Sequence, residues 1–122
     1  MKAAIIGFGS IGARHAAILN NMGLSVSVVS LRNDVPYPVY KNIELLFDAD
    51  IPDYLIISNA TEHHCSTFEQ IKKLGFKGIL LIEKPVSGAY VPIEEFCPTF
   101  VAYQLRFHPI LQKMHNICAN GV

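Results

Sequence analysis

The chain has 122 residues, with ten basic and ten acidic side chains that leave its formal net charge at zero. This length suits one domain whose hydrophobic core is large enough to fold without disulfides or metal. The neutral balance argues against nucleic-acid or membrane-surface binding that depends on bulk charge. Cys65, Cys97 and Cys118 are far apart in sequence, so neither a disulfide framework nor a metal site is indicated.

Hydrophobic residues make up 51% of the chain, but its apolar stretches are short. None approaches the roughly 20 residues that a membrane-spanning helix needs. The first residues resemble a signal peptide only faintly, because Gly7, Gly9, Gly12 and Arg14 interrupt the apolar region. We therefore expect a cytoplasmic protein with no membrane contact.

A glycine-rich turn near the N-terminus gives the strongest functional signal. The stretch Gly7-Phe8-Gly9-Ser10-Ile11-Gly12 follows an apolar strand at residues 3–6 and leads into a helix. In this setting the first glycine permits a sharp turn, the second leaves room for a pyrophosphate, and the third lets helix and strand pack closely. Unpaired N–H groups and the helix dipole favour an anion there. The sequence therefore predicts a dinucleotide site that includes Gly7, Gly9, Ser10, Ile11 and Gly12.

The remainder of the chain alternates short apolar runs with helical patterns. Strands are expected at residues 26–29, 39–40, 54–58, 79–82 and 100–103. Helices are expected at 43–47, after a cap at Thr61 as far as Gly75, and at about 109–118, with room for only a stub near 93–96. This order predicts an α/β fold over residues 1–122: a doubly wound parallel sheet of the Rossmann type in three α/β/α layers.

The end of the second strand bears on the choice of cofactor. NAD sites carry a carboxylate there for the ribose hydroxyls, whereas a 2′-phosphate needs that anion absent and an arginine present. Here the strand ends in Ser30-Leu31-Arg32, and both Ser30 and Arg32 can bind a phosphate. The sequence therefore favours NADP(H), with NAD(H) as the alternative. Asp34 lies slightly farther on and could reverse the preference, and Arg32 could instead be a solvated loop cation.

Three further segments, together with the glycine turn, resemble the Gfo/Idh/MocA family of dehydrogenases. They are Glu83-Lys84-Pro85 after a predicted strand, residues 59–64 ending in His64, and residues 103–109 after the last strand. The resemblance spans nearly the whole chain. It implies an NAD(P)-dependent oxidoreductase that transfers hydride to or from a sugar, a polyol or a related hydroxy compound.

The same resemblance implies roles for individual residues. Lys84 would be catalytic, beside the nicotinamide and the substrate hydroxyl, while Asn59 and His64 would line the cofactor and Arg106 would lie near the pocket. Chemistry supports the lysine independently, because oxidation of an alcohol needs a proton to be taken from its oxygen. Glu83 is expected to orient Lys84 at the cofactor site.

Bland alternatives remain for several of these residues. Lys84 could be an ordinary surface lysine at a strand end, and His64 could simply pack its helix. Pro85 fixes the turn and is compatible with a cis bond. Surface or packing roles are expected for the other four histidines, which are His15, His63, His108 and His115.

The chain also departs from the family pattern. The connection from residue 86 to residue 99 is short for the long helix that the family places there, and Ala60 stands where a proline is usual. The family's C-terminal α/β domain, with its substrate floor, oligomer interface and catalytic histidine, has no counterpart here. We therefore expect cofactor binding with little turnover by these residues alone, and association into a homo-oligomer.

Two other functions stay open at this point. The first is a stand-alone module that binds or senses NADP(H) without catalysis. The second is a nucleotide-sugar or adenosyl-methionine site built on the same glycine turn, for which the Glu-Lys-Pro segment has no obvious task.

Overall fold

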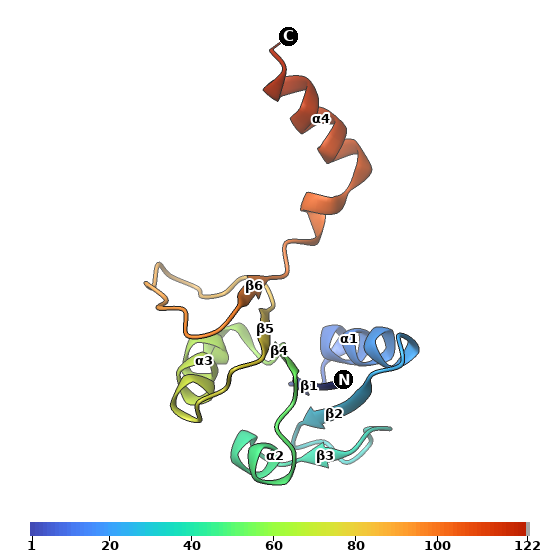
Figure 1. Ribbon diagram of the computed structural model, residues 1–122, viewed down its shortest axis with the longest axis vertical. Helices are drawn as coiled ribbons and strands as arrows, with labels where there is room; N and C mark the ends of the chain where they lie inside the picture. The colour runs from blue at the N-terminus through green and yellow to red at the C-terminus, as the bar shows by residue number, and fades with distance from the viewer. Residues whose placement is uncertain (122) are drawn as a thin grey trace.

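The computed structural model describes residues 1–121, which form one six-stranded parallel sheet with helices around it (Figure 1). The strands are β1 (Lys2–Ile6), β2 (Ser25–Val29), β3 (Val39–Tyr40), β4 (Tyr54–Ile57), β5 (Ile79–Ile82) and β6 (Thr99–Val101). The helices are α1 (Ser10–Asn21), α2 (Ile43–Ala49), α3 (His64–Lys73) and α4 (Pro109–Ala119), with 3-10 turns η1 (Thr61–His63) and η2 (Gln104–Phe107). The predicted α/β class and the Rossmann-type sheet are confirmed.

The strand order is β3-β2-β1-β4-β5-β6, so the chain first moves outward from β1 and then returns to its other side. This reversal between β1 and β4 is the switch point at which open parallel sheets bind ligands. The register pairs Ile6 with both Val29 and Ile57, and pairs Ile57 with Ile82. Residues that directly follow these positions therefore lie side by side along the carboxyl edge of the sheet.

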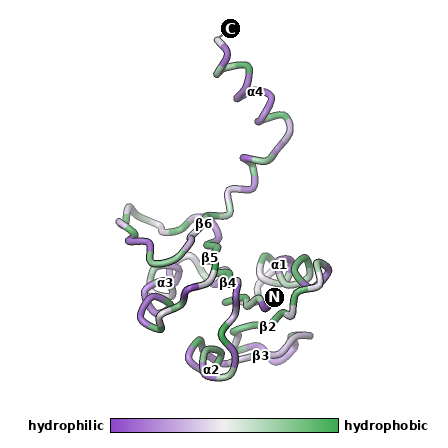
Figure 2. Tube along the Cα trace, in the orientation of Figure 1, coloured by the Kyte–Doolittle hydropathy of each residue, from purple (hydrophilic) through white to green (hydrophobic). Residues whose placement is uncertain are grey.

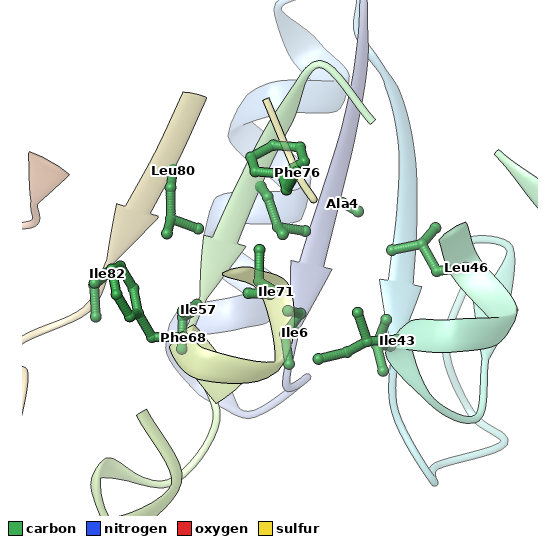
Figure 3. Packing of buried hydrophobic residues seen from close by; sticks show 12 residues of the cluster. Ala4, Ile6, Ile43, Leu46, Ile57, Phe68, Ile71, Phe76, Leu80 and Ile82 are labelled. Atoms are coloured by element: carbon green, nitrogen blue, oxygen red, sulfur yellow. The ribbon is translucent and has the colours of Figure 1, made fainter. Parts of the chain in front are cut away.

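Alternation of side chains along the strands supplies both faces of the sheet with apolar groups. On one face, strand residues such as Ile6, Ile57 and Ile82 pack with α2 and α3 (Figure 3). On the other face, Ile5 and its neighbours pack against α1. The buried helix residues in these two clusters are Ile43, Leu46, Phe68 and Ile71 on the first face and Ala16 and Leu19 on the second. The sheet is thus the middle of three layers.

The start of the third helix differs from expectation. Thr61 does not cap the third helix: it begins the turn η1, and α3 starts only at His64 with no side-chain cap. Asn42, in contrast, caps α2 by accepting a hydrogen bond from the Leu45 N–H at 2.8 Å.

The connection between β5 and β6 contains no helical stub at residues 93–96. It runs without a helix along the α3 side of the sheet, where Ile93 and Phe96 pack on the core. The ring of Phe96 lies 5.0 Å from that of Phe68, centroid to centroid. Burial of these side chains therefore orders the segment where a helix is absent.

Helix α4 extends away from the sheet, beyond β6 and η2 (Figure 1). None of its residues is buried, and hydrophobic and hydrophilic residues alternate along its trace (Figure 2). Ile110, Leu111, Met114 and Ile117 share a helical spacing and are 41–63% exposed. Within residues 1–121, no helix is both long and apolar enough to cross a membrane.

Candidate dinucleotide site

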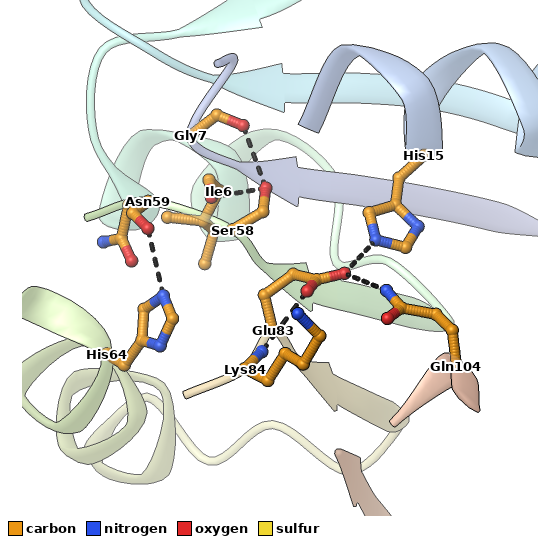
Figure 4. Close-up of polar contacts among 9 residues, drawn as sticks. All are labelled: Ile6, Gly7, His15, Ser58, Asn59, His64, Glu83, Lys84 and Gln104. Carbon is orange, nitrogen blue, oxygen red and sulfur yellow. Dashed lines mark hydrogen bonds and ion pairs between the residues drawn. The ribbon is translucent and has the colours of Figure 1, made fainter. Parts of the chain in front are cut away.

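The glycine turn joins the end of β1 to the start of α1. Gly7 has a φ of +94°, and a Cβ there would lie 2.6 Å from the backbone of Asn59. A Cβ on Gly12 would lie 2.1 Å from the Gly7 carbonyl oxygen and 2.8 Å from Ser58 Oγ. Ser58 Oγ also lies 3.2 and 3.1 Å from the carbonyl oxygens of Ile6 and Gly7 (Figure 4). These two glycines therefore let α1 approach the ends of β1 and β4 closely.

Gly9 differs from the other two glycines of the turn. Its φ of −79° suits any residue, and a Cβ built on it would meet no atom within 4 Å. The open space lies at the N-terminus of α1, which has no side-chain cap and no acidic residue in its first turn. Ser10 and Ile11, at the start of the helix, are exposed. This arrangement fits an anionic phosphate bound by backbone N–H groups.

The loop after β2 places the side chain of Arg32 beside the glycine turn. Arg32 donates from Nη1 to the Phe8 carbonyl oxygen at 3.2 Å and from Nε to Asp34 Oδ1 at 2.8 Å. The Arg32 backbone N–H donates to Ser30 Oγ at 3.1 Å. Hydrogen bonding from the Arg32 guanidinium lowers the pKa of Asp34 to about 2. The arginine is thus held beside the glycine turn, with a carboxylate as its present partner.

The end of β5 carries the Glu-Lys-Pro segment. Glu83 is buried, and its carboxylate accepts hydrogen bonds from His15 Nε2 at 2.6 Å, from Gln104 Nε2 at 3.5 Å and from the Lys84 N–H at 3.3 Å (Figure 4). The Lys84 side chain is exposed, and the peptide bond between Lys84 and Pro85 is cis.

His15 is the site residue that sequence reasoning missed. We expected only a surface or packing role for it, yet it lies in the second turn of α1 and reaches Glu83 across the end of the sheet. The position of His15 relative to the buried residues of its helix could have indicated this role. His15 comes three residues after Gly12 and one before Ala16, both of which face the sheet, so a helix places it at the edge of the buried face.

His64 and Asn59 lie at the end of β4. The His64 ring is 2% exposed, with Nδ1 2.9 Å from the Pro85 carbonyl oxygen and Nε2 3.0 Å from the Asn59 carbonyl oxygen. Asn59 Nδ2 donates to Thr67 Oγ1 at 2.8 Å. Both ring nitrogens of His64 thus face backbone, and the ring ties the end of β4 to the turn after β5.

The structure therefore brings the glycine turn, Asn59 and the Glu83–Lys84 pair to one edge of the sheet. A pocket of about 490 Å³ lies between α1 and this pair, beside the contact of His15 with Glu83, and is lined by Ile11, His15 and Lys84 among others. Arg106 is placed differently, with its guanidinium carbon 5.5 Å from the centre of the Phe107 ring. In residues 1–121, no three His, Cys, Asp or Glu side chains are grouped so that they could hold a metal ion.

Known proteins resemble this chain in structure rather than in sequence. No protein-family model and no curated protein sequence matches it. Among solved structures, myo-inositol 2-dehydrogenase from Lactobacillus plantarum aligns with 99% of the chain at 21% identity and a TM-score of 0.78. The WlbA dehydrogenase from Thermus thermophilus, in complex with NAD and α-ketoglutarate, aligns with 100% at 20% identity and a TM-score of 0.72.

A third solved structure extends this group. UDP-N-acetylglucosamine 3-dehydrogenase GnnA from Acidithiobacillus ferrooxidans aligns with 95% of the chain at 18% identity and a TM-score of 0.68. The chain spans only 41%, 48% and 42% of the lengths of these three proteins, respectively. The chain thus has the fold of one part of these sugar and polyol dehydrogenases.

Proposed function

We propose that the chain is the dinucleotide-binding domain of an NAD(P)-dependent dehydrogenase of the Gfo/Idh/MocA type. The observation that carries this proposal is the contrast within the glycine turn. Gly7 and Gly12 are closed in by backbone, whereas the space over Gly9 is open at an uncapped helix start. Packing alone would not require Gly9 to lack a side chain, but a bound pyrophosphate would. The shared fold with dehydrogenases such as the NAD-bound WlbA supports the same conclusion.

Each residue at the sheet edge then has a task. Backbone N–H groups at Ser10, Ile11 and Gly12 bind the pyrophosphate, and the exposed Lys84 amine takes or returns the proton of the substrate hydroxyl. The nicotinamide ring supplies the hydride chemistry when the cofactor is bound. The Glu83 carboxylate accepts a long hydrogen bond, of 3.3 Å, from the backbone N–H of Lys84.

His64 and Asn59 belong to the same site in supporting roles. The buried His64 ring fixes the carbonyl oxygens of Asn59 and Pro85, and thereby the two strand ends that face the cofactor. Asn59 contributes its backbone to the close approach beside Gly7.

For the cofactor itself we propose NADP(H) in preference to NAD(H). Arg32 is held beside the glycine turn by the Phe8 carbonyl oxygen, and Ser30 directly follows β2. A 2′-phosphate would replace Asp34 as the partner of Arg32, since a dianionic phosphate is a stronger acceptor for a guanidinium than a carboxylate. Asp34 opposes this choice, because its carboxylate also suits ribose hydroxyls.

The substrate is proposed to be a sugar, a cyclic polyol or a related hydroxy compound. The names of the similar structures include a myo-inositol dehydrogenase and a dehydrogenase of a nucleotide sugar. The exposed apolar stripe of α4, with Ile110 and Met114, is a surface that favours association, so we also propose a homo-oligomer. Sedimentation velocity at several concentrations tests this last point, and a monomer at every concentration would contradict it.

Calorimetric titration of the purified chain with NADPH and with NADH tests the central proposal. We expect binding of both, tighter for NADPH, and the absence of binding by either would refute it. Lys84→Ala should bind the cofactor as the parent chain does, because backbone N–H groups of the glycine turn, and not Lys84, bind the pyrophosphate. In an active enzyme that contains this domain, the same substitution should abolish turnover, and substantial retained activity would contradict the role given to Lys84.

A further inference from the structure

The carboxylate of Glu83 and the amine of Lys84 are neighbours in sequence but do not form an ion pair. Among residues 1–121, ion pairs within 4.0 Å include Glu83 with His15, and none involves Lys84. An exposed lysine amine next to a carboxylate would ordinarily turn toward it. The Glu83 carboxylate instead has another partner.

The partner of the Glu83 carboxylate is the ring of His15. Its Nε2 lies 2.6 Å from Glu83 Oε1, the shortest of the three contacts that the carboxylate makes. A carboxylate in its ionised form only accepts hydrogen bonds, and the Nε2–H tautomer of His15 supplies the matching donor. Glu83 is 7% exposed, which makes an unpaired carboxylate at this place costly.

The other two hydrogen bonds of the Glu83 carboxylate are longer and therefore weaker than the contact with His15. The Lys84 N–H and Gln104 Nε2 lie 3.3 and 3.5 Å from the carboxylate oxygens, and both distances exceed the usual length of such a bond. Without His15, the cationic side chains that line the same pocket as Glu83 are those of Arg14 and Lys84. Lys84 directly follows Glu83 in the chain, and its long side chain lines this pocket beside the carboxylate.

We infer that His15 is a positioning residue: by binding Glu83 it keeps this carboxylate from capturing the Lys84 amine, which stays free in the pocket beside the glycine turn. The inference rests on the proposed function in that Lys84 is the residue that acts there. It also gives α1 a second task. The helix whose first turn binds the pyrophosphate holds, one turn later, the group that frees the lysine.

The test compares the reactivity of the Lys84 amine in four chains, measured by limited acetylation at constant pH and peptide mass spectrometry. A free amine reacts and an ion-paired one is protected, and a partly exposed ion pair slows the acetylation of its amine by up to roughly fivefold. His15→Ala should slow acetylation of Lys84 by about this factor. His15→Gln, which keeps an N–H donor near the position of Nε2, should restore the rate of the parent chain.

The fourth chain distinguishes an effect of His15 on the position of the Lys84 amine from a general disturbance of the fold. The double variant His15→Ala/Glu83→Gln removes the carboxylate that would trap the lysine, so its Lys84 should react at the parent rate again. His63→Ala, which alters an exposed histidine, is the matched control and should have no effect. The acetylation rates of the other lysines show whether a variant has unfolded.

Two results would overturn the inference. One is a Lys84 rate in His15→Ala equal to that of the parent chain, and the other is a double variant that stays as slow as His15→Ala. The readout needs no cofactor, so it is independent of the proposed function. A parent chain that binds neither NADPH nor NADH but follows the expected order of acetylation rates would refute the dehydrogenase proposal and leave the role of His15 standing.

Discussion

Replacing glycines 9 and 12 by alanine separates the two requirements of the turn, one for folding and one for the ligand. In Gly12→Ala the new Cβ would lie 2.1 Å from a backbone oxygen, whereas an ordinary contact begins at 3.4 Å. The Gly7 carbonyl would have to move by about 1.3 Å within a packed strand end. Overpacking of this kind costs about 3 kcal/mol, which corresponds to a fall in Tm on the order of 10 °C for a domain of this size.

Gly9→Ala should behave in the opposite way. Its Cβ meets nothing within 4 Å and its φ is ordinary, so only the weaker capping by alanine counts, at about 0.5 kcal/mol or about 2 °C. The methyl group would instead occupy the phosphate space and remove one charged hydrogen bond or more. We expect NADPH affinity to fall by roughly tenfold to a hundredfold.

Differential scanning fluorimetry and calorimetric titration of both variants measure the two effects. Gly88→Ala is the matched control, since its Cβ also enters open space but lies far along the chain in the connection after β5. It should change neither property. Wild-type NADPH affinity in Gly9→Ala would show that the open space is not the phosphate site, and wild-type stability in Gly12→Ala would refute the packing argument.

The remaining predictions concern the ribose end, the core and one cap. Arg32→Ala should weaken NADPH binding by roughly tenfold and leave the affinity for NADH unchanged, whereas Asp34→Ala should strengthen NADPH binding. Equal effects on the affinities for both cofactors would reject the 2′-phosphate assignment. Phe68→Ala, which empties a site only 2% exposed, should cost about 3–5 kcal/mol in urea unfolding, and a loss below about 1 kcal/mol would contradict its place in the core. Asn42→Ala should cost about 1 kcal/mol by the same assay, because the Leu45 N–H loses its acceptor, and no change would show that the cap is not formed in solution.

Most of the sheet could be predicted from sequence because its signals are local. Apolar runs such as residues 79–82 and the glycine turn at residues 7–12 determine strands and their connection by short-range sterics. The connection after β5 could not be predicted in the same way. Its order comes from long-range burial of Ile93 and Phe96 against α3, which no local pattern reveals.

The same division holds at the site. The glycine turn and the Glu-Lys-Pro segment carry recognisable spacing, so their meeting at one edge followed from the parallel topology. The contact between His15 and Glu83 joins residues 68 positions apart and depends on the rotation of α1 about its axis. Periodicity could place His15 near the buried face, but only the structure shows which strand end that face meets.

The aligned strand ends also allow the two halves of a bound coenzyme to be altered separately. The group proposed to bind the ribose phosphate follows β2, and the group proposed to move the proton follows β5, with β1 and β4 between them. Three strand spacings put these loops roughly 14 Å apart, beyond the range at which substitutions usually influence one another. Coenzyme preference can therefore be re-engineered at the β2 end without disturbing the chemistry at the other.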